Sequence, residues 1–512
     1  MSSSQVVPPQ APSGKGLAQG QLGLFGSTVM GLASTAPVYS LVATLGFVIT
    51  AVGFQAPIAL ILAFIPMFFI AFAYRELNRA VPDCGTTFTW TTKAFGPWVG
   101  WMGGWGVAIA GIIVLANLAQ IAGIYFWLFV GGFTGDTGPA ETVWVTTLTG
   151  VIFIAAMVYV SYRGVEIGEK LQNILLGIQY LALALFVIFA FGSVANGSAP
   201  EAVPVSIEWF NPFGFTSFDG FTEAILLSLF IYWGWDTCLA LNEETKDPKR
   251  IPGRAALIST VVLVITYVLV AVAAISYAGI DALTDQDDVF LVVKDALFGP
   301  WAWLLVLAVM ISAISSTQTT ILPTARGTLS MAIYRALPSK FAIVHPKFHT
   351  PGFATLVMGI ISVAFYVGMT LISENFLADS IYSLGLAIAF YYGLTGYACV
   401  WYFRRELFTS AFNVVYKFLF PLLGALILTA AFVKSAIDML NPDYGYTILF
   451  GVGGVFVIGI GALLLGAVVM VVWSRFPGSK PFFRGESLNM QTDVLVPEGA
   501  VPVRRSVDGG RV

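Results

Sequence analysis

Residues 219–254 decide the fold, and they read DGFTEAILLSLFIYWGWDTCLALNEETKDPKRIPGR. The stretch begins as an apolar helix, is interrupted at Gly234, Trp235 and Asp236, and ends in a charged block. A carboxylate in the middle of a membrane helix costs about 2.5–3.5 kcal/mol on insertion scales. A glycine weakens a helix by about 1 kcal/mol relative to alanine. A membrane helix that is both broken and charged at mid-depth is typical of a transport site.

The composition is that of a polytopic membrane protein. Of the 512 residues, 57% are hydrophobic and only 10% are charged, whereas a soluble globular protein carries about 25% charged residues. The net charge of −3 provides no basic surface for nucleic acid. Three cysteines and two histidines, His345 and His349, provide neither a disulfide framework nor a metal-binding pattern. We therefore expect an all-α polytopic membrane protein with no metal and no cofactor.

Apolar segments long enough to cross a bilayer, which takes about 20 residues, recur along the whole chain. They cover residues 22–49, 54–76, 97–130, 142–162, 168–194, 220–242, 255–279, 300–324, 352–373, 378–403, 411–433 and 446–473. The sequence thus predicts twelve transmembrane helices in a single membrane domain, residues 22–475. The polar tails, residues 1–21 and 476–512, are predicted to be disordered, and the first of them lacks the pattern of a signal peptide.

The distribution of basic residues predicts the orientation, because cytoplasmic loops carry an excess of Lys and Arg. With both termini in the cytoplasm, all of the 25 Lys and Arg residues except Lys294 and Lys434 fall on the cytoplasmic side. This separation favours a multi-pass protein of the cytoplasmic membrane with both termini inside the cell.

The first predicted span is also interrupted, since its middle reads MGLASTAP over residues 30–37. Pro37 removes a backbone donor and clashes with the preceding turn. The second interruption comes five spans later, in the sixth span, and the odd offset places the two broken helices in opposite orientations. Breaks in corresponding positions of two halves are expected of an inverted-repeat transporter.

Broken helices offer charge-binding groups at membrane depth. A half-helix that begins near Ser34, Thr35 and Ala36 presents amide hydrogens and a positive dipole end to a carboxylate. The main-chain carbonyls near Phe230, Ile231 and Trp233 are suited to an ammonium group, and Asp236 and Asn117 are further candidates for the substrate site. A site of this kind fits a zwitterion such as an α-amino acid. The alternative is that the Pro and Gly residues merely kink their helices, as most do.

Three blocks of the sequence resemble the amino acid–polyamine–organocation (APC) superfamily of permeases. The blocks are GWD at 234–236 followed by EETKDPKRIP at 243–252, YREL at 74–77 with the stretch up to Trp105, and PTAR at 323–326 with the stretch up to Pro351. The resemblance covers residues 22 to 475. It implies a LeuT-type 5+5 inverted repeat with broken first and sixth helices, plus two further helices. It also implies that Phe230 is an aromatic gate.

One departure from the family concerns the coupling ion. Many proton-coupled members carry a lysine in the fifth span, where this chain has Gln179. Glutamine does not titrate, so coupling through that lysine is excluded. The hydroxyls of Ser315 and Ser316 are a candidate sodium site, although Ser and Thr often bond to their own helix backbone. Coupling to H⁺ through Asp236, coupling to Na⁺, exchange and facilitated diffusion all remain open.

The charged block after the sixth span has two interpretations. Glu243, Glu244 and Arg250, with the lysines between them, are candidates for ion pairs that latch the cytoplasmic gate. The alternative is a solvated loop that simply follows the charge rule for cytoplasmic loops.

The leading hypothesis is secondary transport of an amino acid by alternating access. A polyamine or organic-amine transporter or exchanger of the same fold is the alternative, because Asp236 would pair with a second ammonium group. A membrane-embedded enzyme is disfavoured because Asp236 has no carboxylate or histidine partner in the spans. A nutrient sensor that binds but does not transport is a third hypothesis. The expected partners are therefore an amino acid or amine, a coupling ion (H⁺ or Na⁺) and the lipid bilayer.

Overall fold

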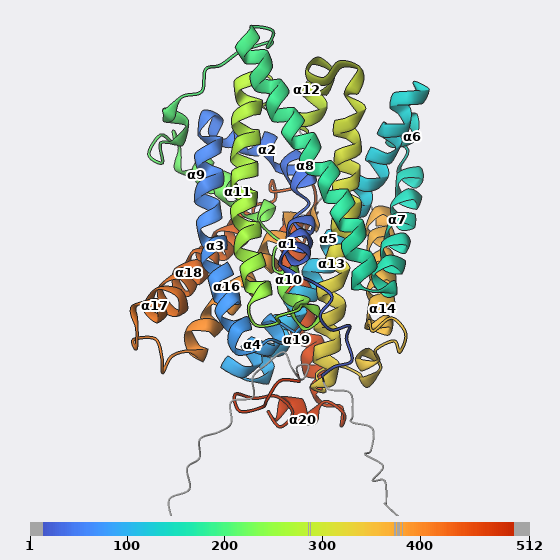
Figure 1. Cartoon of the computed structure of the whole chain (residues 1–512), viewed down its shortest axis with the longest axis vertical. Coiled ribbons are helices and arrows are strands. Elements are labelled where there is room, and N and C mark those ends of the chain that lie inside the picture. The colour runs from blue at the N-terminus through green and yellow to red at the C-terminus, as the bar shows by residue number, and fades with distance from the viewer. Residues whose placement is uncertain are drawn as a thin grey trace, which may run out of the picture.

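The computed structural model describes residues 14–284, 286, 288–372, 375, 379–380 and 382–495. This part of the chain is built from helices that run along the long axis of the molecule (Figure 1). Its only strands are the antiparallel pair β1 (Ile448–Leu449) and β2 (Val452–Gly453). The prediction of an all-α polytopic membrane protein is confirmed.

The long helices follow the predicted apolar segments. They are α1 (Leu24–Ser34), α2 (Pro37–Val52), α3 (Ala56–Ala80), α5 (Pro97–Thr134), α7 (Val143–Arg163), α8 (Val165–Asn196), α9 (Phe218–Ile231), α11 (Ile251–Ala278), α13 (Trp303–Ile333), α14 (Gly352–Ile372), α16 (Leu384–Tyr402), α18 (Phe420–Asp438) and α19 (Gly454–Ser474). Within the described residues, 10 helical stretches are long and apolar enough to cross a membrane. This count is lower than the number of predicted segments because Leu24–Ala80 forms one stretch and α9 has only 14 residues.

Short elements connect the long helices. They are α4 (Thr87–Phe95), α6 (Gly138–Glu141), α10 (Thr237–Ala240), α12 (Val289–Phe298), α17 (Ala411–Asn413) and α20 (Lys480–Phe483), the 3₁₀ turns η1 (Gly53–Gln55), η2 (Ile207–Phe210), η3 (Asn242–Glu244), η4 (Gly299–Trp301) and η5 (Ser339–Ala342), and the π-helical turn η6 (Val414–Leu419). In Figure 1, α4 and α20 lie at one end of the bundle and α12 at the other.

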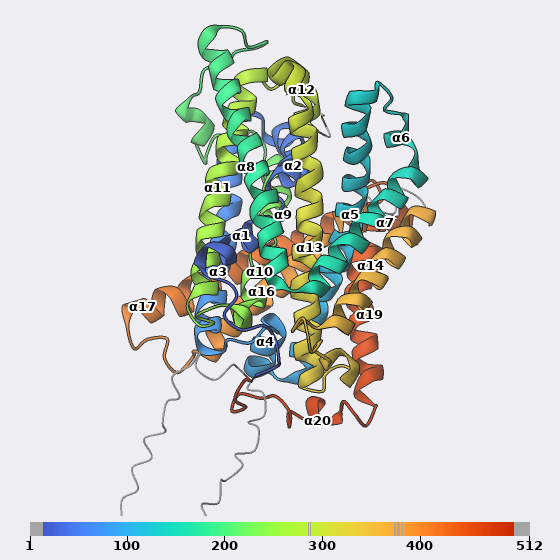
Figure 2. The same cartoon turned by 45° about the vertical axis from the view of Figure 1, so that its right-hand side comes forward.

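The interior of the bundle is formed by α1, α5, α10 and α13. α13 packs along α5, and α1 lies against α10, α11 and α13 (Figure 2). The outer helices expose large apolar side chains, among them Ile360 on α14, Ile437 on α18 and Val468 on α19. Large apolar patches on an exposed face are expected where lipid, not water, is the solvent.

Parts of both tails differ from the predicted disorder. Lys15 and Leu17 are buried near one end of the bundle. Phe482 and Leu488 are fully buried, with the Phe482 ring 5.5 Å from that of Phe88. The composition of each tail is polar on average, but these few side chains find partners in the membrane domain. Residues 1–13 and 496–512 of the predicted tails lie outside the described residues.

Candidate functional site

The first interruption of a helix lies between α1 and α2. α1 ends at Ser34 and α2 begins at Pro37, with Thr35 and Ala36 between them. Ala36 has a left-handed φ of 47°, which together with the proline ends a regular helix. The amides of Thr35 and Ala36 each donate to the carbonyl three residues earlier, at 3.2 Å. In this conformation both amides therefore have partners, whereas the sequence analysis expected donors free for a carboxylate.

The second interruption lies between α9, which ends at Ile231, and α10, which begins at Thr237. Gly234 between them has a φ of +113°, a conformation that side chains other than glycine rarely adopt. A Cβ atom on Gly234 would lie 2.7 Å from the carbonyl oxygen of Ser34. The two interruptions therefore touch each other, and only glycine fits at the point of contact.

The carbonyls expected to bind an amine have different environments. That of Phe230 accepts the Trp233 amide at 3.0 Å, and that of Ile231 accepts the Tyr267 hydroxyl at 2.9 Å. The Trp233 carbonyl accepts no hydrogen bond within the described part of the chain. Of the three, it is the carbonyl that remains available to a ligand.

Ser34 joins three helices at this point. Its hydroxyl lies 2.8 Å from the Thr237 hydroxyl at the start of α10. Its carbonyl accepts the hydroxyl of Ser316, on α13, at 2.9 Å. The end of α1 is thus tied both to the second interruption and to α13.

A small cavity lies where the two interruptions meet. Its volume is about 10 Å³, which is room for about one water molecule. It is lined by Ser34, Val107, Gly111, Trp233, Gly234, Asp236, Thr237, Thr320, Pro323, Thr324 and Tyr391. The Trp233 indole donates a hydrogen bond to the Tyr391 hydroxyl across it. The lining combines hydroxyls, two aromatic rings and a single carboxylate, so it is suited to a small polar ligand.

Asp236 is the carboxylate of this lining and is only 9% exposed. The Tyr392 hydroxyl, on α16, donates to its Oδ1 at 2.8 Å. The same hydroxyl lies 3.4 Å from the Gly234 amide, which donates to it. Asp236 is therefore held at the edge of the cavity by the tenth predicted span.

The residues considered for ion coupling are spread over α8 and α13. Gln179 is fully buried, and its side-chain amide has no partner among the described residues. The Ser315 hydroxyl donates to the Gln172 side chain, and Ser316 donates to Ser34 as described above. The two hydroxyls proposed for a sodium site thus point to different acceptors.

Asn117 and Phe230 do not line the cavity. Asn117 is buried on α5, where its side-chain oxygen accepts the Tyr39 hydroxyl. Phe230 is partly buried and packs against the apolar core. Neither contacts the small cavity in the described conformation.

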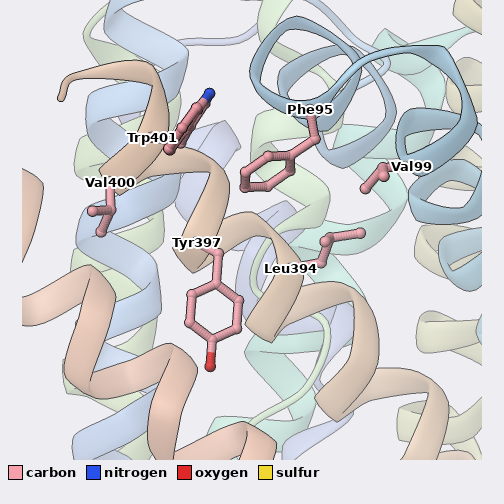
Figure 3. A pocket seen from close by; sticks show the side chains of 6 residues that line it. All are labelled: Phe95, Val99, Leu394, Tyr397, Val400 and Trp401. Carbon is pink, nitrogen blue, oxygen red and sulfur yellow. The ribbon is translucent and has the colours of Figure 1, made fainter.

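A larger hollow opens on the outside of the bundle (Figure 3). Its volume is about 520 Å³, and it is lined by Phe95, Val99, Leu394, Tyr397, Val400 and Trp401. Apart from the Tyr397 hydroxyl and the Trp401 indole nitrogen, these side chains are apolar, and none of them carries a charge. It shares no residue with the cavity between the interruptions and offers nothing to bind a zwitterion.

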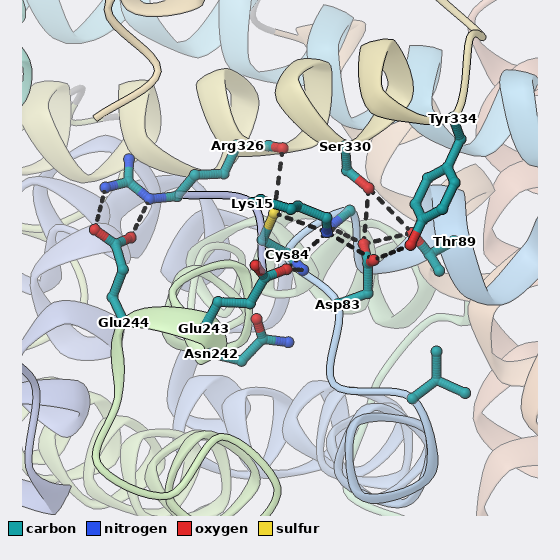
Figure 4. A network of polar contacts seen from close by, with 12 residues as sticks. Lys15, Asp83, Cys84, Thr89, Asn242, Glu243, Glu244, Arg326, Ser330 and Tyr334 are labelled. Carbon is teal, nitrogen blue, oxygen red and sulfur yellow. Dashed lines mark hydrogen bonds and ion pairs between the residues drawn. The ribbon is translucent and has the colours of Figure 1, made fainter. Parts of the chain in front are cut away.

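The charged block after α10 does not pair within itself. Glu244 forms a bidentate ion pair with Arg326 on α13, at 2.5 and 2.9 Å. Glu243 pairs with Lys15 of the N-terminal segment at 2.7 Å, as Figure 4 shows. Arg250 is exposed, and it forms no ion pair in the part of the chain that the structure covers. The partners of the two glutamates therefore come from distant parts of the sequence.

Asp83 joins Lys15 and Glu243 in a buried charged cluster outside the membrane-spanning helices. It lies in the loop between α3 and α4 and pairs with Lys15 at 2.6 Å. Burial alone would raise the pKa of Asp83, but the Lys15 ammonium and two hydroxyl donors hold it below its usual range. Burial raises the pKa of Glu243 although Lys15 acts in the opposite direction. Of the two carboxylates, Asp83 is thus the better satisfied.

Several residues of these sites had not been predicted as functional, among them Lys15, Asp83, Arg326 and Tyr392. Asp83 and Arg326 both lie in or next to the sequence blocks that mark the superfamily, so a charge in those blocks was the available signal. Tyr392 was one of several polar residues in an apolar span. Lys15 had no local signal, because it stands alone in a tail rich in Pro, Ser and Gly.

Comparisons with known proteins identify a family of membrane permeases. The sequence model described as amino acid permease matches residues 22–488. The branched-chain amino acid permease BcaP of Bacillus subtilis is 24% identical over 372 residues, which is 69% of this chain and 75% of that protein. The methylthioribose transporter of Bacillus subtilis is 24% identical over 352 residues, 67% of this chain and 73% of that protein. The Asc-type amino acid transporter 1 of Mus musculus is 26% identical over 325 residues, 62% of this chain and 60% of that protein.

The membrane-spanning helices and the family match together define a polytopic membrane transporter. The chain belongs to the amino acid permease family, whose sequence model matches residues 22–488. The predicted membership in the APC superfamily is thereby confirmed, and the family and its relatives are transporters, not enzymes.

Proposed function

We propose that this protein is a secondary transporter that moves an amino acid across the cytoplasmic membrane by alternating access. In this proposal the membrane domain, residues 22–475, crosses the membrane twelve times as a LeuT-type 5+5 inverted repeat plus two helices, with both termini in the cytoplasm. The observation that carries the proposal is that the two helix interruptions touch at Ser34 and Gly234 and enclose one polar cavity.

The proposed binding mode uses groups on both sides of the contact. The Trp233 carbonyl, which is free in the described part of the chain, receives the substrate ammonium. The Ser34 and Thr237 hydroxyls and the first-interruption amides receive the carboxylate after they exchange their present partners. Because the cavity holds only about one water molecule, the described conformation is closed, and Trp233 and Tyr391 separate to admit the substrate.

For energy coupling we favour Asp236. It is the one carboxylate among the lining residues described, and Gln179 does not ionise. Ser315 and Ser316 would have to release Gln172 and Ser34 before their hydroxyls could hold a sodium ion. Proton coupling through Asp236, or exchange without an ion, therefore requires fewer broken contacts than sodium coupling.

An organic amine or polyamine is the alternative substrate, and Asp236 at the cavity is the observation that favours it. A second ammonium group would pair with this buried carboxylate, which in the described conformation accepts a hydrogen bond from the neutral Tyr392 hydroxyl. The methylthioribose transporter among the relatives indicates that similarity at this level extends to proteins named for other substrates.

A thermal-shift screen of the purified full-length protein tests the substrate class. The panel contains the common amino acids, putrescine, spermidine and choline, with glucose as the control ligand. At about 100 times its Kd a true ligand stabilises the folded state by about 2.7 kcal/mol. We expect one or more amino acids to raise the melting temperature of both the natural protein and Asp236→Asn. Stabilisation by polyamines alone, lost in Asp236→Asn, would replace the amino acid proposal by the amine alternative.

A further inference from the structure

The N-terminal segment, which comprises the described residues 14–23 ahead of α1, is hydrogen-bonded to the chain that follows α10. Leu22 forms a parallel bridge with Thr245. The amides of Gln21 and Leu22 donate to the Glu244 carbonyl at 2.8 and 3.1 Å, and the Lys246 amide donates to the Leu22 carbonyl at 2.9 Å. Because α1 begins two residues later, at Leu24, the segment links the first interrupted helix directly to the chain that follows α10.

Lys15 belongs to the same N-terminal segment. Its side chain is completely buried, and its ammonium lies 2.6 Å from Asp83 Oδ2 and 2.7 Å from Glu243 Oε1. Figure 4 shows the ammonium between the two carboxylates, next to the Cys84 thiol at 3.5 Å. The carboxylates and this thiol lie within 4.8 Å of one another, the spacing of a cation site. The tethered ammonium takes the place that a free cation would occupy.

The two carboxylates depend on Lys15 to different degrees. Asp83 also accepts hydrogen bonds from the Thr89, Ser330 and Tyr334 hydroxyls and from the Gly85 amide, at 2.7–2.9 Å. Among the described residues, the carboxylate of Glu243 has the Cys84 amide, at 2.9 Å, as its one hydrogen-bond donor besides Lys15. Its second oxygen is buried without a partner among the described residues. Withdrawal of Lys15 would leave Asp83 satisfied and Glu243 as a buried, nearly unpaired charge.

The two carboxylates stand on different parts of the bundle. Asp83 is held by α4 and by the end of α13, whereas Glu243 follows α10 and is tied to α1 through the N-terminal segment. Alternating access requires the interrupted helices to move relative to the rest of the bundle. The bridge that Lys15 forms between Asp83 and Glu243 therefore lies between parts of the bundle that this motion separates, and the Arg326–Glu244 pair lies between the same parts.

We propose that Lys15 is a gate residue, whose ammonium clamps the Asp83 loop to Glu243 and must withdraw before the transport pathway opens at this end of the bundle. The N-terminal segment is then part of the transport machinery and not a dispensable tail. This inference rests on the proposed function, because a gate has meaning only where a pathway opens and closes.

Cys84 supplies a direct probe of the clamp. It is buried inside the cluster, so a maleimide reaches its thiol when the cluster opens, and burial also raises the pKa of this thiol. The sequence has only two other cysteines, Cys238 and Cys399. Replacing both by alanine leaves Cys84 as the single target for a membrane-impermeant maleimide applied to the purified protein.

The test compares labelling rates of Cys84 in this background. We expect Lys15→Met to raise the rate by about tenfold or more, since local opening controls access to a buried group, and Lys15→Arg to stay close to the parent. Lys170→Met is the matched control, because Lys170 is exposed and pairs with Glu166 within its own helix. Adding Glu243→Gln to Lys15→Met should bring the rate back toward the parent, which a simple loss of tail packing would not do.

The outcomes separate the clamp from the function. Unchanged labelling in Lys15→Met, or equal labelling in Lys15→Met and the double variant, would overturn the clamp. Size-exclusion chromatography and helix content identify a variant that has unfolded, and Lys15→Arg then still tests whether a positive charge suffices. If Cys84 labelling responds as expected but the protein transports nothing, the clamp is supported. The proposed function is then refuted.

Discussion

Gly234 is the residue on which the geometry of the candidate site depends most directly. It combines a φ of +113° with a separation that would place a Cβ atom 2.7 Å from the Ser34 carbonyl oxygen. Both conditions exclude any other residue without movement of the backbone. The contact between the two interrupted helices therefore depends on Gly234. This contact in turn positions the neighbouring residues Trp233 and Asp236.

We expect Gly234→Ala to abolish substrate binding and to destabilise the protein by about 1–3 kcal/mol, the usual cost of a residue held in an unfavourable backbone conformation. Gly177→Ala is the control, because a Cβ atom there meets no atom within 4 Å and Gly177 lies within α8. Chemical denaturation of the detergent-solubilised protein and the ligand-induced thermal shift measure the two effects. A Gly234→Ala protein with natural stability and binding would show that the helix contact is not required.

Both helix interruptions were predictable from the sequence, whereas the hydrogen-bond partners of the interrupted segments were not. Pro37, Gly234 and Asp236 break a membrane helix through local backbone chemistry, so a reading of neighbouring residues located both interruptions. The Ile231 carbonyl was predicted to bind an amine, but the Tyr267 hydroxyl occupies it. That partner comes from another helix, and no local pattern specifies which helices will face each other.

The ion-pair partners of the charged block after α10 were likewise not predictable from the local sequence. Glu243 and Glu244 were expected to pair with nearby basic residues, yet Lys15 and Arg326 lie far away in the sequence. The basic residues of the block lie two to seven residues from the glutamates, which is close enough for ion pairs at an exposed surface. A fully buried carboxylate without a partner strongly destabilises the folded state. The fold therefore pairs each of the two glutamates with a basic residue from a distant part of the sequence.

The Arg326–Glu244 pair fastens the end of α13 to the chain after α10, and both side chains are fully buried. Removing one partner of a buried pair typically costs about 3–5 kcal/mol. We expect this loss of unfolding free energy for Arg326→Met, with part of it regained in the double variant Arg326→Met/Glu244→Gln, because the double variant leaves no unpaired charge. Denaturant unfolding followed by tryptophan fluorescence provides the measurement.

Arg484→Met is the matched control for that experiment. Arg484 is 67% exposed and lies 3.9 Å from Glu486, and an exposed pair of this kind contributes about 1 kcal/mol or less. Equal losses of unfolding free energy in Arg326→Met and Arg484→Met would mean that the buried pair does not fasten α13 to the chain after α10.

For the whole molecule, the helical membrane fold follows from hydropathy, since a run of about 20 apolar residues has few alternatives to a membrane helix. Each long helix described falls within or close to a predicted segment. The tails were harder to predict, because a few buried side chains such as Lys15 and Phe482 are diluted in a polar composition. The orientation and the inverted repeat rest on charge distribution and offset, and they stay predictions.

Counterflow in proteoliposomes that contain the full-length protein shows directly whether the protein transports an amino acid. Liposomes are preloaded with the unlabelled amino acid that gives the largest thermal shift, and uptake of the same amino acid in labelled form is followed. We predict a transient accumulation of label above the outside concentration, absent in Gly234→Ala and present in Gly177→Ala. Saturable binding of the amino acid without any accumulation of label would contradict transport and would favour a sensor that binds but does not transport.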